Sequence, residues 1–271
     1  MISTKMLMKA EHFFIKARTL IREAILSAEL TGAEFVPYVQ PVYKAEKIVG
    51  GEVLLRVFKD GVLHSPEKYL SAMESCEVIN DVTCSLVSEV TSFFEGYTGT
   101  LPNDFYISFN ICARQLNSSR VIEAVTDFHK KFEGHISLVL EIVERGTAAL
   151  NDFSLETMQH LTDTGVQFAI DDFGSGSSCI KYVEHVGFSK IKLDKCLTIA
   201  CEGSLVYPSI IDAIISLSHK LGIQVIAEGV ETWEQLNLLN AKGIKVYQGY
   251  ILSRPMSLNE FRQKIFTNYL Q

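Results

Sequence analysis

The sequence predicts an α/β barrel of eight strands in which one strand runs against the others. Short apolar segments alternate with helical segments through most of the chain, which is typical of parallel strands buried on both faces. Two adjacent extended segments rich in Val, Phe and Tyr precede this alternation. Six alternating strands and this pair make eight, so we expect a modified TIM-like (β/α)8 barrel with one antiparallel strand from an N-terminal β-hairpin. The alternative is a doubly wound open sheet.

The N-terminal elements are expected to be a helix and then the hairpin. Apolar residues recur at helical spacing across residues 5–30, which indicates an amphipathic helix packed on the barrel. The hairpin strands are expected at residues 34–43 and 47–58, separated by only a few residues. We assign residues 1–30 to the helix and residues 31–271 to the barrel. The two parts form one domain, because no low-complexity stretch or Pro/Gly/Ser-rich linker divides the chain.

The alternating part of the chain begins after Glu67. Short apolar runs predict strands at residues 104–111, 135–142, 167–171, 188–193, 223–227 and 244–248. Helical periodicity predicts helices at residues 81–94, 113–132, 155–164, 204–221 and 232–241. In a barrel built this way, the carboxyl ends of the parallel strands meet at one mouth, where active sites of this architecture lie.

Composition and charge limit the classes of function. A formal net charge of -7 argues against a protein that binds DNA or RNA by neutralising phosphates. No apolar run approaches the roughly 20 residues that a bilayer-spanning helix needs, and residues 1–9 lack the apolar core of a signal peptide. We expect a cytoplasmic chain, which could also be the cytosolic part of a longer protein with an upstream sensor or membrane segment.

The six cysteines show no CxxC pairing and no zinc-finger spacing. They are Cys76, Cys84, Cys112, Cys179, Cys196 and Cys201. Scattered cysteines of this kind indicate reduced thiols in a cytosolic chain. With 271 residues, 47% of them hydrophobic, the chain has enough apolar surface to form a core without disulfides.

Acidic, amide and cationic side chains lie at the carboxyl ends of the predicted strands. They are Asn110, Glu141, Asp171, Asp172, Lys192, Asp194, Glu228 and Gln248. A single acid at a strand end is more often a helix cap or a surface charge. Several carboxylates at one mouth, however, repel each other unless a cation neutralises them. Oxygen-rich ligands of this kind favour Mg²⁺ or Mn²⁺ over zinc.

The adjacent pair Asp171 and Asp172 suggests a particular metal chemistry. One carboxylate can lie between two metal ions while the other binds the second ion, as in the two-metal hydrolysis of a phosphodiester. The alternative is a plain turn in which Asp172 caps the next helix. The glycines within residues 174–178 predict either a mobile loop over the mouth or the start of that helix.

Seven short motifs resemble those of the EAL domain family, in the family's order, from about residue 34 to residue 255. They are EVLLR at 52–56, SFN at 108–110, LEIVE at 140–144, DDFGSG at 171–176, IKLD at 191–194, AEGVET at 227–232 and QGY at 248–250. Three positions differ from the family's pattern: Val53 replaces alanine, Ser175 replaces threonine and Ser177 replaces a common tyrosine. No metal ligand of the pattern is missing.

The resemblance implies a phosphodiesterase that uses Mg²⁺ or Mn²⁺, with two ions expected, to hydrolyse cyclic di-GMP to linear pGpG and so lower the second-messenger level. It implies a homodimer as well. The metal ligands implied are Glu52, Asn110, Glu141 and Asp171 for one ion, and Asp171, Asp172 and Glu228 for the other.

The resemblance also implies roles for the remaining site residues. The catalytic residues implied are Lys192, Glu228 and Glu52; the substrate-binding residues are Arg56, Asp194 and Gln40; and the supporting residues are Glu231 and Gln248. We expect Lys192 to orient or activate the attacking water, because a buried ammonium near two metal ions can have a lowered pKa that permits proton transfer. The alternatives are a surface lysine for Lys192 and a partner in a rim salt bridge for Arg56.

Two other functions fit parts of the sequence. Val53 and the altered loop at Ser175 and Ser177 favour a receptor that binds cyclic di-GMP without turnover and signals through a partner protein. A barrel lyase or isomerase could use Lys192 to abstract a proton next to a carboxylate stabilised by a metal. The lyase interpretation leaves the adjacent pair Asp171 and Asp172 without a role.

Overall fold

The computed structural model describes residues 30–74, 77–97, 100–143, 150–175 and 187–269. The N-terminal helix predicted at residues 5–30 lies outside the described residues apart from its last position, and so does the predicted loop beyond Ser175. The assignment of residues 1–30 to a helix packed on the barrel therefore stays a prediction.

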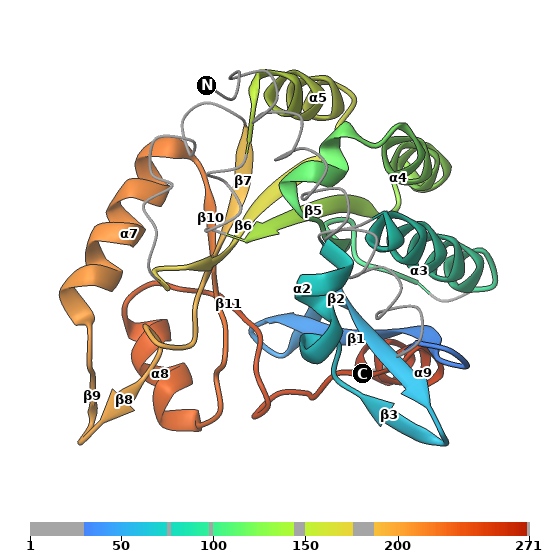
Figure 1. The fold of residues 1–271 in the computed structure, drawn as a ribbon. Helices are drawn as coiled ribbons and strands as arrows, with labels where there is room; N and C mark the ends of the chain where they lie inside the picture. Colours follow the sequence, from blue (N-terminus) through green and yellow to red (C-terminus); the bar gives the residue numbers. More distant parts are fainter. Residues whose placement is uncertain (1–29, 75–76, 98–99, 144–149, 176–186, 270–271) are drawn as a thin grey trace, which may run out of the picture.

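A closed barrel of eight strands forms the centre of the molecule (Figure 1). Its strands, in order around the ring, are β1 (Glu34–Lys44), β2 (Lys47–Lys59), β4 (Tyr106–Asn110), β5 (Ser137–Val143), β6 (Gln167–Phe173), β7 (Phe188–Leu193), β10 (Gln224–Ala227) and β11 (Val246–Tyr247). Strand β1 pairs antiparallel with both β2 and β11, and every other neighbouring pair is parallel. The predicted barrel with one reversed strand is confirmed, and the open-sheet alternative is wrong because β1 closes the ring.

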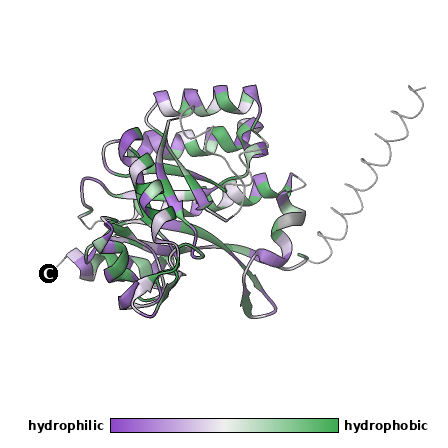
Figure 2. Ribbon diagram, turned by 90° about the vertical axis from the view of Figure 1, so that its left-hand side faces the viewer, coloured by the Kyte–Doolittle hydropathy of each residue, from purple (hydrophilic) through white to green (hydrophobic). Residues whose placement is uncertain are grey.

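Helices surround the barrel on its outer side (Figure 1). They are α3 (Val78–Glu95), α4 (Ser119–Phe132), α5 (Asp152–Asp163), α7 (Pro208–Leu221), α8 (Trp233–Ala241) and α9 (Leu258–Tyr269), whereas α2 (Glu67–Glu74) is drawn near the centre of the view in Figure 1, beside β2. Apolar and polar residues alternate along them in Figure 2, as expected for helices that pack one face on a core. In α4, for example, Val121, Val125 and Phe128 are buried at helical spacing.

Two predicted helices begin later than the sequence suggested. The helix expected at residues 113–132 is a 3-10 helix, η1 (Ala113–Asn117), followed by α4, because Ser118 between them is extended. The helix expected at residues 204–221 begins at Pro208. Proline lacks a backbone N–H and fits only the first turn of a helix, so the helix starts there.

Several short elements were not predicted. The strand pair β8 (Ala200–Cys201) and β9 (Ser204–Leu205) precedes α7, while β3 (Val62–His64) and β12 (Met256–Ser257) extend the sheet beyond the closed ring. Helix α9 was also missed, because it buries only Phe261 and Ile265 and so carries a weak apolar pattern.

The interior of the barrel contains a compact apolar layer to which seven strands contribute one residue each. Its members are Val42, Val49, Tyr106, Val139, Ala169, Ile226 and Val246. On β7, Lys190 lies against this layer, with its Nζ 5.0 Å from the centre of the Tyr106 ring. Burial lowers the pKa of Lys190 to about 8. This layer forms the floor beneath the polar residues described below.

Two further features of the described residues bear on the predictions. No helix among them is long and apolar enough to cross a membrane. Four cysteines, Cys84, Cys112, Cys196 and Cys201, are free thiols, while Cys76 and Cys179 lie outside the described residues.

Candidate metal and active site

The predicted polar residues point into one mouth of the barrel because of strand alternation. Side chains two positions apart on a strand share a face. Each of five site residues lies two positions from a member of the apolar layer on the same strand or its direct continuation; they are Gln40, Glu141, Asp171, Glu228 and Gln248. These polar side chains therefore form the next layer of the interior, above the apolar floor.

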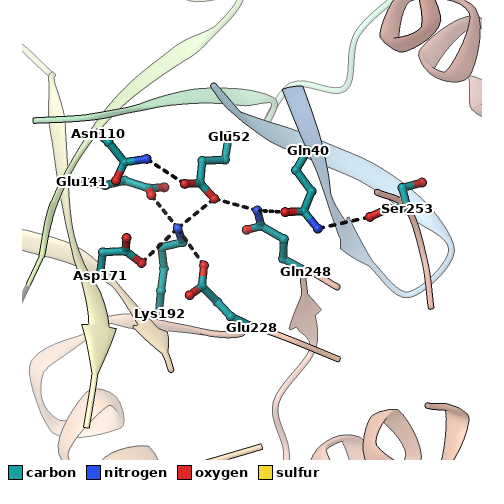
Figure 3. A network of polar contacts seen from close by, with 9 residues as sticks. All are labelled: Gln40, Glu52, Asn110, Glu141, Asp171, Lys192, Glu228, Gln248 and Ser253. Carbon is teal, nitrogen blue, oxygen red and sulfur yellow. Dashed lines mark hydrogen bonds and ion pairs between the residues drawn. The ribbon is translucent and has the colours of Figure 1, made fainter. Parts of the chain in front are cut away.

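Lys192 lies at the centre of this layer and contacts four carboxylates (Figure 3). Its side chain is 1% exposed. The Nζ atom is 2.5 Å from Glu141 Oε2, 2.7 Å from Glu228 Oε1, 3.0 Å from Glu52 Oε2 and 3.1 Å from Asp171 Oδ1. One ammonium cannot balance four ionised carboxylates, so the group carries excess negative charge or holds extra protons.

Burial and charge act differently on the individual carboxyl groups. Burial raises the pKa of Glu52, but the nearby ammonium and hydrogen bonds from Asn110 and Gln248 bring it below its ordinary value. Burial raises the pKa of Glu141 to about 8 although the same ammonium opposes the shift. Burial also holds the pKa of Glu228 well above its usual range. Without a further cation, the site therefore binds protons near neutral pH.

In the metal-free protein the pKa of Lys192 is raised; the lowered pKa that we expect beside two bound metal ions stays a prediction. Burial alone lowers it, but Asp171, Glu141, Glu228 and Glu52 together raise it well above the ordinary value for lysine. Lys192 is therefore a permanent cation in this arrangement. The surface-lysine alternative is wrong, because the side chain is buried.

Two groups of three carboxylates have the spacing of metal ligands. In one group, Glu52, Glu141 and Asp171 each offer an oxygen within 4.8 Å of the others. In the second, Asp171, Asp172 and Glu228 do the same. Asp171 belongs to both groups. All donors are carboxylate oxygens, which is the donor set that Mg²⁺ and Mn²⁺ prefer, so these residues fit a divalent metal.

An irregularity in β6 allows both adjacent aspartates to face the site. In a regular strand, consecutive side chains point to opposite faces of the sheet. The pairing of β6 with β7 shifts register between Ile170 and Phe173, and Asp172 has a left-handed backbone with φ of 54°. Aspartate tolerates this region better than most residues. The shift turns Asp172 toward Asp171 and Glu228, which a regular strand would prevent.

Amide side chains hold Glu52 from two sides (Figure 3). Asn110 Nδ2 donates to Glu52 Oε1 at 2.7 Å, and Gln248 Nε2 donates to Glu52 Oε2 at 2.7 Å. Gln248 Nε2 also lies 3.2 Å from Gln40 Oε1, and Gln40 Nε2 donates to the Ser253 carbonyl at 3.1 Å. No sequence pattern indicated Ser253, because Ser253 contributes a backbone oxygen, which every residue type has.

Two cavities meet at the carboxylates. The larger, of about 640 Å³, is lined by Glu52, Asn110, Asp171 and Asp172 and continues along apolar side chains under α2. The smaller, of about 370 Å³, is also lined by Glu52, Asp171 and Asp172. The carboxylates that the two cavities share therefore separate two compartments, one largely apolar and one polar.

The remaining predicted residues line these cavities. Arg56 lines the larger cavity and donates to the Leu55 carbonyl at 2.8 Å. It has no ion pair within the described part of the chain. Asp194 and Glu231 line the smaller one together with Gln40 and Gln248. Asp194 Oδ1 also accepts from the Cys196 amide at 2.9 Å. The rim salt bridge considered for Arg56 is therefore not observed.

The raised pKa of Glu141 predicts that metal affinity depends on pH. Below about pH 8 a metal ion must displace the proton on Glu141, so Mn²⁺ affinity should rise up to about tenfold per pH unit from about pH 6 to about pH 8. Above about pH 8 Glu141 has lost this proton, so its contribution to the rise in Mn²⁺ affinity should end. Titrating Mn²⁺ by electron paramagnetic resonance at several pH values measures this slope, and an affinity that is flat across the range would contradict it.

Comparisons with known proteins agree with this geometry. A family model described as "EAL domain" matches residues 22–255. Signaling protein YkoW of Bacillus subtilis (strain 168) is 31% identical over 255 residues, which are 91% of this chain and 31% of YkoW. Cyclic di-GMP phosphodiesterase PdeL of Escherichia coli (strain K12) is 30% identical over 247 residues, 89% of this chain and 68% of PdeL.

A solved structure named "PaMucR Phosphodiesterase, c-di-GMP complex" has the same fold, with a TM-score of 0.72 and 27% identity over 84% of this chain and 99% of that one. The chain spans about a third of YkoW and about two thirds of PdeL. The family model covers most of the chain and includes the strands that carry every site residue. The chain therefore belongs to the EAL domain family.

Proposed function

We propose that this chain is a metal-dependent phosphodiesterase that hydrolyses cyclic di-GMP to linear pGpG. The observation that carries the proposal is the carboxylate of Asp171, which is common to two groups of metal-ligand spacing where two cavities meet. Support also comes from PdeL, which is named a cyclic di-GMP phosphodiesterase. The PaMucR structure, which is named as a complex with c-di-GMP, supports the choice of substrate.

Two divalent ions, Mg²⁺ or Mn²⁺, would be held by the carboxylates and by Asn110. The proposed ligands are Glu52, Asn110, Glu141 and Asp171 for one ion and Asp171, Asp172 and Glu228 for the other. Such ions polarise a phosphoryl oxygen and lower the pKa of a bound water, which supplies a nucleophile near neutral pH. They would also neutralise the carboxylates, which otherwise repel a substrate with two negative phosphates.

Lys192 donates hydrogen bonds to the attacking water and holds the carboxylates in place. Its pKa is raised in the metal-free protein, where four carboxylates surround it. Two bound ions would neutralise those carboxylates and lower this pKa, so that Lys192 could also exchange a proton with the water. Glu228 is a second candidate for taking the proton from that water. Its side chain is 17% exposed on the smaller cavity, and burial raises its pKa in the metal-free protein.

The two cavities would hold the two halves of the cyclic dinucleotide. Arg56 in the larger cavity has no ion-pair partner within the described residues, and a guanidinium suits phosphate oxygens. In the smaller cavity, Asp194 can accept from a base or a ribose hydroxyl. Gln40 contributes less to substrate binding than we expected from the sequence, because both ends of its amide already bond Gln248 and Ser253. Glu231 supports this cavity at its exposed rim.

Purified protein incubated with cyclic di-GMP and Mg²⁺ or Mn²⁺ is expected to form pGpG, which chromatography detects. EDTA should stop the reaction. Glu52→Gln, which keeps the shape and removes a charge from the metal ligands, should slow it by about a hundredfold or more. Glu123→Gln, on the exposed face of α4, is the matched control and should keep full activity. Tight binding of cyclic di-GMP with no product under any of these metals would support the receptor alternative instead.

The expected homodimer, the cytoplasmic location and an upstream sensor or membrane segment stay predictions. The same holds for the individual roles of the site residues. Each role can be tested by one substitution in the assay above, with product formation and metal binding measured separately.

A further inference from the structure

A third cavity lies apart from the site, between α8, α9 and the turn that joins β1 to β2. We call it the α8–α9 groove. Its volume is about 720 Å³, within the range of sites for small molecules. It shares no lining residue with the two cavities of the site. The groove is therefore a separate candidate for a binding site.

The walls of the α8–α9 groove are apolar and aromatic. Trp233 at the start of α8 is 59% exposed, and Leu236 and Leu252 are half-buried. Tyr43 and Tyr247 are buried at its base. Large apolar side chains gathered around a hollow offer contact area to an apolar ligand, whereas single exposed apolar residues are ordinary.

The charge around the groove is positive although the chain carries a net charge of -7. Lys44, Lys245 and Lys264 line it, and Glu46 is the acidic residue among the lining side chains. Within the described residues, none of the three lysines forms an ion pair; Lys245 donates to Asn240 Oδ1 at 2.7 Å. The groove thus combines apolar walls with cations that lack an anionic partner.

Hydrogen bonds that are linked through the residue Ser253 join the groove to the candidate metal ligands. Tyr43 forms part of the groove, and its hydroxyl lies 2.7 Å from Ser253 Oγ. The Ser253 carbonyl accepts from Gln40, whose Oε1 lies 3.2 Å from Gln248 Nε2. Gln248 in turn donates to Glu52. Figure 3 shows these contacts apart from the one between Tyr43 and Ser253. A ligand that moves or holds Tyr43 therefore acts on groups that orient Glu52.

We propose that the α8–α9 groove binds an organic anion with an apolar body, and that its occupancy changes metal binding at Glu52 through Tyr43, Ser253, Gln40 and Gln248. The apolar body packs between Trp233, Leu236 and Leu252. The anionic group faces the lysines, whose charges have no ion-pair partner in the part of the chain that the structure describes. The ligand is an effector and not a substrate, because the groove contains none of the residues that carry the chemistry.

Trp233 is the single tryptophan of the chain, so its fluorescence reports on the groove directly. Decanesulfonate, kept below its micelle concentration, is a suitable probe; it should shift the emission to shorter wavelength in a saturable way. The alcohol of the same chain length should bind more weakly. Lys245→Gln with Lys264→Gln should weaken decanesulfonate binding about fivefold, as loss of two partly exposed charge contacts implies. Lys220→Gln, on the exposed face of α7, is the matched control.

Coupling to the site is tested by the Mn²⁺ affinity, measured by electron paramagnetic resonance with and without saturating decanesulfonate. We expect at least a threefold change in the wild-type protein. Tyr43→Phe keeps the aromatic ring in the groove and removes the hydroxyl bonded to Ser253. This variant should still bind decanesulfonate but lose the change in Mn²⁺ affinity.

Each outcome decides part of the proposal. The anion site would be overturned if decanesulfonate does not change the Trp233 fluorescence, or if the two lysine substitutions do not weaken its binding. An unchanged Mn²⁺ affinity at saturation would overturn the coupling, whereas no Mn²⁺ binding at all would overturn the proposed metal site on which the coupling rests. Neither readout uses hydrolysis, so failure here is distinguishable from failure of the proposed phosphodiesterase activity.

Discussion

Asp171→Asn is expected to reduce hydrolysis of cyclic di-GMP by about a hundredfold to a thousandfold, the range seen when one group that stabilises a transition state is lost. The substitution keeps the size of the side chain and removes one negative charge. Because Asp171 belongs to both groups of candidate ligands, that single charge is lost from two metal positions at once. Substituting Glu141 or Glu228 affects one group only, so Asp171→Asn should be the most damaging of the three.

Asp171→Asn should not lower the stability of the metal-free protein against unfolding. Asp171 lies among carboxylates that share one ammonium, so removing its charge relieves repulsion. We therefore expect an unchanged or raised melting temperature in EDTA together with loss of activity and of Mn²⁺ binding. Initial rates, Mn²⁺ stoichiometry and thermal unfolding measure the three quantities. Asp127→Asn on the exposed face of α4 is the control, and activity within tenfold of wild type for Asp171→Asn would show that no ion is shared there.

The barrel was predictable because its signals are local. Apolar runs of strand length between helical segments identify buried parallel strands, and the short β1–β2 connection identifies the reversed one. The helix starts were not predictable from periodicity, since the extended backbone at Ser118 and the hairpin before Pro208 interrupt segments whose apolar pattern continues. Weakly buried elements such as α9 carry too few apolar residues to be recognised.

The members of the site were predictable, whereas their electrostatics were not. Strand-end positions predicted that Glu141, Asp171, Lys192 and Glu228 converge, and they do. The protonation of Lys192 depends on how many carboxylates lie within about 3 Å, which only closure of the barrel determines. The lowered pKa expected from the sequence assumed two metal ions beside a buried Lys192, whereas the raised pKa is that of the metal-free protein.

Contacts through the backbone were equally hidden. The carbonyl of Ser253 holds Gln40, and the register shift in β6 turns Asp172 into the site, but neither depends on a side chain that a motif would record. The α8–α9 groove was missed for a related reason. Its walls come from the β1–β2 turn, α8, β11 and α9, which are far apart in sequence. No local pattern links such segments.

Lys192→Met is expected to destabilise the metal-free protein by about 3–5 kcal/mol at about pH 8, the usual cost of removing one partner from a buried ion pair. Methionine fills a similar volume, so the main loss is the positive charge. Four carboxylates, including Glu52 and Glu141, would then face each other in a buried layer with no cation. Hydrolysis should be lost as well, because the variant has no donor to orient the attacking water.

The pH dependence of this destabilisation separates charge from packing. The pKa of Glu141 is raised to about 8 in the folded protein against 4.5 for the free group, so the folded state binds more protons than the unfolded state between these values. Stability of the metal-free protein therefore falls as pH rises through this window. In Lys192→Met the carboxyl groups should take up still more protons, and the stability deficit should shrink at about pH 5, where Glu141 and Glu228 are protonated.

Urea unfolding in EDTA at low and high pH measures this deficit, and added Mn²⁺ provides a second test. If the carboxylates bind divalent ions, Mn²⁺ can replace the missing charge and should raise the melting temperature of Lys192→Met more than that of the wild type, because binding to the folded state alone stabilises it. Lys220→Met, at an exposed position of α7, should show neither effect. A deficit for Lys192→Met that is the same at both pH values and insensitive to Mn²⁺ would mean that Lys192 acts through packing, since repulsion between ionised carboxylates must respond to protons and to metal.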